Sequence, residues 1–281
     1  MATDGEALTT GTIANPRLWR LGMLLDPEAR TLTVAATSTV GEEPMLCRRI
    51  ALGDGADTLR ALEDAVYDNP MLLADFDRTT MLLRTPRFAV LPAEGADDAD
   101  ATDDAASLLW TSPDENLRLI TAPVRGTDCA VLAACPADVA AFVGRTFADA
   151  RFAHVLAPEI AYFAAKAPRT GNAPKLFAVA SDMGVDVIVF DGTRLLGATS
   201  YACATADDMA YYAAAAAQVC GVASGELQFH VAGDPVSRDA LIGALRRFAS
   251  HVMPWVFPSG LLADGVAVDT PFPLVILPLC E

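Results

Sequence analysis

The chain has 281 residues, 53% of them hydrophobic, which is enough apolar material for roughly two folded domains. It carries 36 acidic and 20 basic residues, and a formal net charge of -16 would repel a phosphate backbone, so we expect no nucleic-acid partner. The N-terminal segment lacks a signal sequence, and no stretch offers the roughly eighteen apolar residues of a membrane span. We therefore expect a cytoplasmic protein without membrane insertion.

The cysteines and histidines give no sign of a metal site. Six cysteines are scattered without C-x-x-C pairs and are expected to be reduced thiols in apolar surroundings. The three histidines, His154, His230 and His251, lack the spacing of zinc ligands, so a structural role is expected for each. No G-x-S-x-G motif is present, and hydrolase chemistry therefore has no local support.

The first half of the chain predicts three strands in an antiparallel meander, then a helix and a fourth strand. Their ranges are residues 17–24, 31–37, 45–52, 56–66 and 79–85. An aspartate-rich stretch near residues 94–106 follows and is expected to be a solvated loop, because closely spaced aspartates repel and bury no apolar area. Further strands and helices are expected to complete this domain, at residues 117–124, 128–135, 136–147, 151–156 and 158–167.

The second half predicts the same order of elements. Three strands, a helix that begins at Thr205, a fourth strand and a helix capped by Ser237 are expected. The strands are assigned to residues 175–181, 185–190, 194–202 and 226–232. A repeated order of this kind implies two similar α/β domains, which we assign to residues 1–167 and 172–281.

Three stretches resemble those of a bacterial family of unknown function, the domain-of-unknown-function family DUF3822. They are TPRFAVLPAEG at 85–95, ARFAHVLAPEIAYFAAKA at 150–167, and VIVFDGTRLLGATSYACATADDMAYYAAAAAQVCGV at 187–222. The resemblance implies an α/β chain with a duplicated actin-like ATPase, or ribonuclease H-like, fold. Each of its two lobes would have a mixed sheet in βββαβ order with covering helices.

Active actin-like proteins hold ATP with two hairpins that carry Asp-x-Gly turns and with a glycine-rich adenosine segment. The first hairpin would lie at Asp26, where Pro27 and Glu28 replace the glycine and hydroxyl residues; proline has no N–H for phosphate. The second would lie at Asp182 and Gly184. The adenosine segment, VAGDP, has the single glycine Gly233.

These departures favour a non-catalytic binding or scaffolding module, a pseudo-ATPase without an expected cofactor, whose partner is an unknown protein or small ligand. The alternative is an ATPase or small-molecule kinase that binds Mg-ATP through Asp182, Gly184 and Gly233. A two-metal nuclease using Asp182 and Asp186 is a third hypothesis, which the acidic composition disfavours.

Two further segments are apolar or aromatic. Tyr211 and Tyr212, in an alanine-rich helix, are expected to pack in the core or to edge a cleft. The proline-rich stretches HVMPWVFPSG and PFPLVILPLC are expected to cap the second lobe or to form a protein-binding patch.

Overall fold

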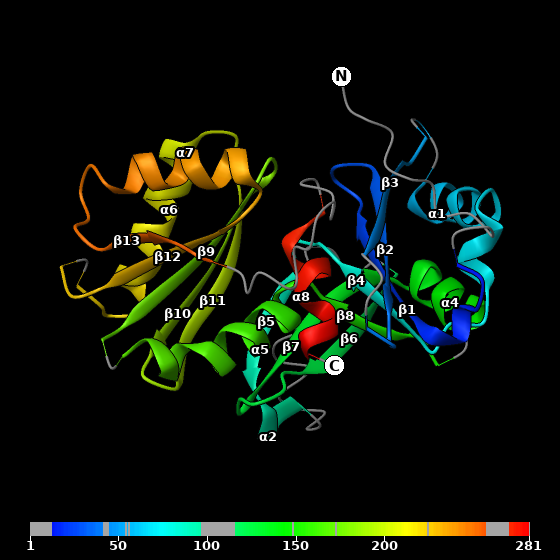
Figure 1. Cartoon of the computed structure of the whole chain (residues 1–281), viewed down its shortest axis with the longest axis horizontal. Coiled ribbons are helices and arrows are strands. Elements are labelled where there is room, and N and C mark those ends of the chain that lie inside the picture. Colours follow the sequence, from blue (N-terminus) through cyan, green and yellow to red (C-terminus); the bar gives the residue numbers. More distant parts are fainter. Residues whose placement is uncertain are drawn as a thin grey trace. The chain divides into compact units, whose positions relative to one another are not determined.

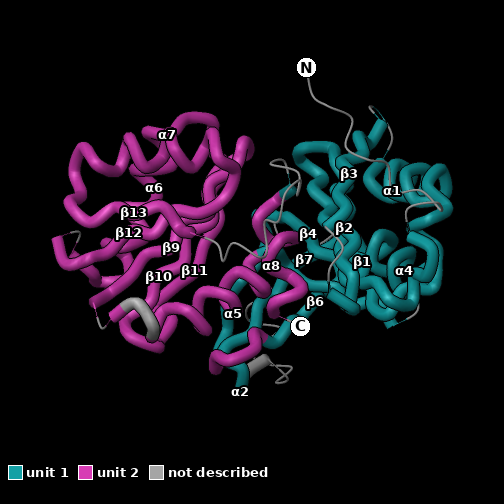
Figure 2. The backbone as a smooth tube through the Cα atoms, in the orientation of Figure 1, with its two compact units in different colours: residues 1–123, 129–155, 262–270 teal, residues 124–128, 156–261, 271–281 magenta. Residues whose placement is uncertain are grey.

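The computed structural model describes residues 13–41, 45–53, 55, 57–96, 116–147, 149–171, 173–223, 225–256 and 270–280. The chain divides into two compact units, shown in different colours in Figure 2. Unit 1 comprises residues 1–123, 129–155 and 262–270, and unit 2 comprises residues 124–128, 156–261 and 271–281. No helix in the described ranges is long and apolar enough to cross a membrane.

Unit 1 contains a five-stranded mixed sheet in the order β3-β2-β1-β4-β8 (Figure 1). Its strands are β1 (Trp19–Asp26), β2 (Thr31–Ser38), β3 (Leu46–Ala51), β4 (Arg78–Leu83) and β8 (Arg151–His154). The first three pair antiparallel, whereas β1, β4 and β8 run parallel. The carboxyl ends of β1, β4 and β8 therefore meet at one edge of the sheet, which is the edge where open α/β sheets hold ligands.

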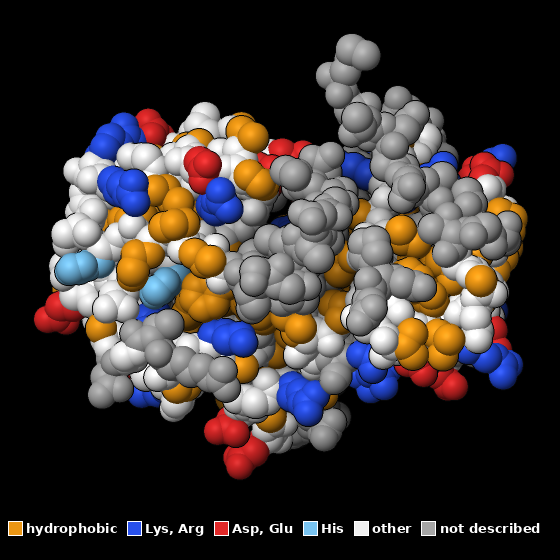
Figure 3. Space-filling view, viewed as in Figure 1, with side chains coloured by type: hydrophobic (Ala, Val, Ile, Leu, Met, Phe, Trp, Pro, Cys, Tyr) orange, Lys and Arg blue, Asp and Glu red, His pale blue; other side chains and the backbone are white. Residues whose placement is uncertain are grey.

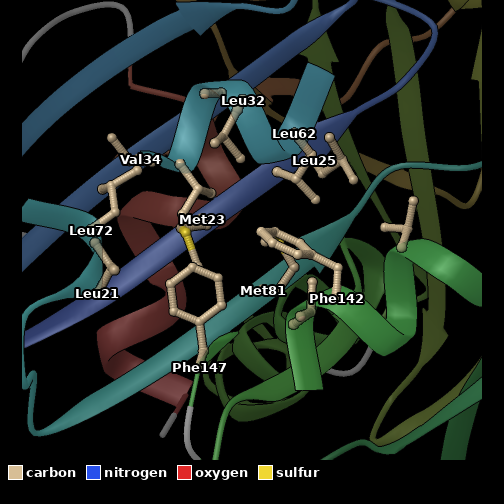
Figure 4. Close-up of a cluster of buried hydrophobic side chains, with 14 of the residues drawn as sticks. Leu21, Met23, Leu25, Leu32, Val34, Leu62, Leu72, Met81, Phe142 and Phe147 are labelled. Carbon is tan, nitrogen blue, oxygen red and sulfur yellow. The ribbon is translucent and has the colours of Figure 1, made fainter. Parts of the chain in front are cut away.

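Two helices of unit 1, α1 (Thr58–Tyr67) and α4 (Ala137–Thr146), supply side chains to the core over this sheet. The first begins at Asp57, whose carboxylate accepts a hydrogen bond from the backbone N–H of Arg60. Figure 4 shows side chains from the strands, among them Met23 and Met81, meeting Leu62 of α1 and Phe142 of α4. Short 3-10 helices, Pro16–Leu18 and Pro70–Leu73, complete the unit.

A smaller antiparallel sheet is inserted between β4 and α4, in the order β5-β7-β6. Its strands are β5 (Phe88–Pro92), β6 (Leu117–Pro123) and β7 (Cys129–Pro136), so both strands expected after the acidic stretch are present. The start of that stretch forms a short helix, α2 (Ala93–Ala96), instead of a loop. The rest of it lies outside the described residues.

Unit 2 repeats the large sheet, in the order β11-β10-β9-β12-β13. The strands are β9 (Lys175–Ser181), β10 (Gly184–Asp191), β11 (Arg194–Ala202), β12 (Gln228–Gly233) and β13 (Val252–Pro254). Pairing repeats as well, because β9 to β11 are antiparallel while β9, β12 and β13 are parallel. The predicted duplication of βββαβ order is confirmed.

Helices α6 (Ala206–Val219) and α7 (Pro235–Leu245) cover one face of this sheet. Thr205 caps α6 as predicted, since its hydroxyl accepts from the N–H of Asp208 and donates to the Asp208 carboxylate. The prediction that Ser237 caps α7 is wrong. The cap is Asp234, whose carboxylate accepts a hydrogen bond from the N–H of Ser237. The helix starts there because Pro235 is favoured in the first turn, where no N–H is needed.

The other face of the unit 2 sheet carries an aromatic cluster under α5 (Leu156–Lys166) and α8 (Phe272–Cys280). Phe163 of α5 stacks on Phe177 of β9, with ring centroids 4.3 Å apart, and on Phe272 of α8, at 5.6 Å. Trp255 meets both Phe163 and Phe177 edge-on and donates its indole N–H to the hydroxyl of Tyr162, at 3.2 Å. A short 3-10 helix, Ala167–Thr170, leads from α5 to β9.

The prolines of the C-terminal stretch are compatible with a helix. Pro273 lies in the first turn of α8, where a missing N–H costs nothing, and Pro278 lies near its end. The helix is buried from Phe272 to Leu277, and the Cys280 thiol donates to the carbonyl of Pro158 in α5. This segment therefore covers α5 within unit 2.

His230 of β12 belongs to the same cluster. Its ring stacks on Phe177 at 5.1 Å and meets Trp255 edge-on, and it is 6% exposed. The buried Nε2 atom has no hydrogen-bond partner within the described part of the chain. Burial, with a contribution from the Lys175 charge, lowers the pKa of this imidazole to about 4.

Acid is therefore expected to weaken unit 2 through His230. The unfolded chain binds a proton near pH 6.5 and the folded chain only near pH 4, so this stabilisation is complete above pH 6.5 and is lost as the pH falls between these values. The loss amounts to about 3 kcal/mol. Urea midpoints measured across this range check it, and His230→Phe should flatten the profile relative to the exposed control His251→Gln. Coinciding profiles for His230→Phe and the unaltered chain would contradict the assignment.

Candidate functional site

The first candidate hairpin joins β1 to β2 in unit 1. Asp26, the last residue of β1, is 6% exposed, and its Oδ1 accepts a hydrogen bond from the backbone N–H of Ala29 at 2.9 Å. Arg30 adopts a left-handed conformation, with φ of 53°, and its guanidinium donates to the carbonyl of Gly53. The turn is thus stabilised by its own backbone and side chains.

Arg84 was not predicted as part of this hairpin. Its Nε lies 3.8 Å from the Asp26 Oδ2, and its backbone N–H donates to the carbonyl of Leu25. The pairing arises because β4 runs parallel to β1, with Leu83 beside Leu25, so the next residues along the two strands also meet. A positive side chain therefore stands beside the carboxylate at this strand end.

The second candidate hairpin, between β9 and β10, is a tight turn in unit 2. Asp182 and Met183 form its exposed tip, and the Ser181 hydroxyl accepts from the N–H of Met183 and donates to the carbonyl of Gly184. Gly184 has a φ of +148°, and a Cβ there would lie 2.0 Å from the Tyr201 carbonyl oxygen. Close approach of β11 is thus sufficient reason for this glycine.

Gly233 ends β12 at the same edge of the unit 2 sheet. It pairs with Ala180, has a φ of +105°, and leaves 2.0 Å between a built Cβ and the Ala180 carbonyl oxygen. The structure therefore brings together Asp182, Gly184 and Gly233 at one end of the sheet. The N–H groups of Asp234 and Ser237 are already engaged, by the Ala180 carbonyl and the Asp234 carboxylate, and Pro235 has none.

The two units differ at matching positions. In unit 1 Asp26 ends β1 beside Arg84, whereas in unit 2 Ser181 ends β9 beside Asp234. Ser181, and not Asp182, is thus the topological counterpart of Asp26. Element order alone does not reveal this match, because the β9–β10 turn is shorter than the β1–β2 turn.

Asp182 and Asp186 do not form a shared carboxylate site. Asp182 is exposed at the turn, whereas Asp186 is buried within β10 and accepts a hydrogen bond from the Ser200 hydroxyl of β11. Within the described ranges, no group of three or more His, Cys, Asp or Glu residues is arranged to hold a metal ion. The nuclease hypothesis therefore has no geometric support in these ranges.

Several other candidate groups have structural roles. His154 contacts the carbonyl of Thr85 through Nε2, at 3.0 Å, and stacks on Phe88. Burial raises the pKa of the Cys135 thiol to about 12 and also raises those of Cys203 and Cys220. All six cysteines are free thiols, but only Cys129 and Cys135 are buried in a core, and the other four are half-buried.

Of the two roles expected for Tyr211, core packing is wrong, because the residue is 68% exposed. Tyr212 stacks on Tyr201 of β11, with ring centroids 4.5 Å apart, and Tyr211 meets Tyr212 edge-on. These two successive residues point in different directions because α6 turns by about 100° per residue. An aromatic group is therefore displayed beside β11.

Charge is dispersed on the face drawn in Figure 3. Lysine and arginine side chains there lie singly among acidic and uncharged groups, without gathering into one basic patch. The expected absence of a nucleic-acid partner stays a prediction.

Comparison with known proteins identifies the fold. A Bacteroides thetaiotaomicron protein described as having an actin-like ATPase fold and unknown function is similar, with 16% identity and a TM-score of 0.77 over 95% of this chain and 97% of that chain. A structure described as a PilM-PilN type IV pilus biogenesis complex is similar over 94% of this chain and 98% of that chain, with 13% identity and a TM-score of 0.53. The predicted α/β, actin-like ATPase fold is thus confirmed.

No curated protein matches the sequence significantly. The model of a family described as "Protein of unknown function (DUF3822)" matches residues 23–252. This match covers most of the chain, because it begins within β1, includes β2 to β12 and ends at Val252, the first residue of β13. The chain therefore belongs to the DUF3822 family.

Proposed function

We propose that this chain is a non-catalytic actin-like binding or scaffolding module, a pseudo-ATPase whose partner is a protein or a small ligand. The observation that carries the proposal is that the Asp26 carboxylate already has partners within the protein. This carboxylate accepts the Ala29 N–H and lies beside the Arg84 guanidinium. A magnesium ion would have to compete with that guanidinium for the carboxylate.

Both hairpins also have few backbone N–H groups left to donate hydrogen bonds to a phosphate. Pro27 has no N–H, and the N–H groups of Ala29 and Met183 are bonded within their own turns. In unit 2 the start of α7 is capped by the Asp234 carboxylate, whose negative charge would oppose a phosphate group there. These features support a fold that has kept its architecture without its nucleotide contacts.

An ATP-binding ATPase or small-molecule kinase is the second candidate. It is favoured by the placement of Asp182, Gly184 and Gly233 at one end of the unit 2 sheet. In that case backbone N–H groups and Mg²⁺ would have to supply most of the phosphate contacts. Close packing explains both glycines without a ligand, so the first candidate is preferred.

Millimolar Mg-ATP is expected to leave the melting temperature of the full chain unchanged. A ligand present at 100 times its Kd would add about 2.7 kcal/mol to the stability of the state that binds it, which a thermal-shift assay resolves easily. The assay should include Asp182→Ala and the control Asp191→Ala, an exposed aspartate in the other turn of β10. A Mg-ATP-dependent rise that disappears only in Asp182→Ala would overturn the proposal in favour of the ATPase.

The kind of partner is supported by one structural relative. The PilM-PilN structure is described as a complex, so a chain with this fold can serve in assembly with another protein. By analogy, a protein partner is the first to be sought for the present chain.

A further inference from the structure

Strand β11 is one of the two outer strands of the unit 2 sheet, and β13 is the other (Figure 1). Of the strands that the structure describes, only β10 pairs with β11. Every residue from Leu195 to Tyr201 is half-buried, and Arg194 and Ala202 at the two ends are exposed. An outer strand presents a row of backbone N–H and C=O groups on its free side, which is a template for a further strand.

This edge lacks the charged residues and prolines that protect many outer strands, and its one irregularity is a β-bulge at Leu196, close to the start of the strand. From Leu195 to Ala202 the sequence is LLGATSYA, without a charged residue or a proline. The equivalent outer strand of unit 1, β3, is protected, because Arg48 and Arg49 are exposed at its centre. The equivalent outer strands of the two halves therefore differ, since β3 has charged residues at its centre and β11 has none.

An aromatic group borders the carboxyl end of β11. Tyr201 belongs to the strand and stacks on Tyr212 of α6, and the ring of Tyr211 is exposed beside them. Exposed tyrosine rings bind apolar side chains and, through their faces, the cationic heads of lysine and arginine. The strand edge and the tyrosines thus form a continuous surface, which we call the β11 edge.

The charges near this surface are mainly acidic. Asp207 and Asp208 lie in the first turn of α6, and the turn that carries Asp182 is tied to the end of β11 because Cys203 N–H donates to the Met183 carbonyl. Arg247 pairs with Asp207. The whole chain carries a net charge of -16, so a basic segment is favoured over an acidic one and over a second copy of the chain.

We propose that the β11 edge is a docking site for an extended, basic segment of a partner protein, which adds as a sixth strand and places a lysine or arginine over the tyrosines. This inference rests on the proposed binding function. Main-chain hydrogen bonds to β11 supply the affinity, and the half-exposed side chains on its two faces select alternate apolar residues of the segment. The basic residue fixes the direction of the added strand.

Short random peptides displayed on phage, selected on the full-length protein, provide the probe. Enriched peptides are expected to combine lysine or arginine with alternating apolar residues, and to slow amide exchange across residues 194–202 when bound. A double substitution, Ala198→Arg with Thr199→Arg, transfers to β11 the two arginines of β3. It should weaken binding of the enriched peptides about tenfold or more, equivalent to about 1.4 kcal/mol.

Two tyrosine variants test the docking site without changing a residue of β11, so their result does not depend on whether an altered strand still folds. Tyr211→Ala alters an exposed residue and should weaken peptide binding about threefold. The loss of affinity should be larger in low salt than in high salt, because salt screens the attraction between a cation and the ring. The control Tyr67→Ala removes an exposed tyrosine from α1 of unit 1 and should leave binding unchanged. Circular dichroism and melting temperature confirm that each variant is folded.

Three results would overturn the docking site. They are the absence of any enriched peptide, enrichment of acidic peptides, and binding that survives both the double substitution and Tyr211→Ala. Each leaves the nucleotide assay untouched. Mg-ATP binding would conversely overturn the proposed function while leaving a mapped peptide site in place, so the two failures are distinguishable.

Discussion

Replacing Gly233 with alanine is expected to lower the stability of unit 2 by about 4 kcal/mol, or to prevent its folding. The residue has a φ of +105°, where an L side chain is strained, and a Cβ would lie 2.0 Å from the Ala180 carbonyl oxygen and 2.7 Å from the Ala180 nitrogen. Because these are backbone atoms of the central strand β9, relief requires β9 and β12 to separate.

Urea and thermal unfolding of Gly233→Ala check this expectation. Gly243→Ala is the matched control, since a Cβ at Gly243 in α7 would enter open space and alanine favours a helix by about 1 kcal/mol. The control should be as stable as the unaltered chain or more so. A Gly233→Ala protein with an unchanged midpoint would show that β12 does not approach β9 in this way.

Replacing Phe163 with alanine is expected to destabilise unit 2 by about 3–5 kcal/mol. Its ring is fully buried between Phe177 of β9 and Phe272 of α8, and it also meets Tyr162 and Trp255 edge-on. Truncation would leave a cavity between three elements, and the rigid rings around it cannot collapse to fill it.

Phe248→Ala is the control for this substitution, because Phe248 is 51% exposed and lies outside the aromatic cluster. Its urea midpoint should stay close to that of the unaltered chain. Near-ultraviolet circular dichroism should lose intensity in Phe163→Ala, since the packed rings around Trp255 produce that signal. Equal midpoints for the two variants would rule out the stacked arrangement of α5, β9 and α8.

Local signals predicted most of the fold. Short apolar runs mark β1, β2 and β9 to β11, alternation of apolar and polar residues marks β12, and the Thr205 cap with Asp208 marks the start of α6. The order of elements then predicts two similar sheets, which the structure confirms. These signals are sufficient because each depends on residues close together in the chain.

Features that depend on tertiary pairing were not predicted. Arg84 meets Asp26 only because β4 lies parallel to β1, and no spacing in the sequence shows that register. No helix was predicted for the proline-rich stretch that forms α8, yet Pro273 stands in the first turn, where proline is tolerated. Core packing was one of two roles expected for Tyr211 in its alanine-rich helix, whereas its position around the helix exposes it.

The strands that flank the candidate site were predicted from the sequence, whereas the hydrogen bonds and charge pairs within the site were not. Asp182 and Gly233 lie near one end of the unit 2 sheet, and their expected role in binding a nucleotide stays a prediction. The turn length that makes Ser181 the counterpart of Asp26 became visible only when both sheets could be aligned strand by strand.

The packing of α8 on α5 also has a kinetic consequence. The contact between Cys280 and Pro158 joins residues 122 positions apart, so closing it costs more chain entropy than any hairpin of the unit 2 sheet. Contacts of such long sequence separation form late on the folding pathway. Side chains of α8 should therefore govern how fast unit 2 unfolds, while those of the β9–β10 hairpin govern how fast it folds.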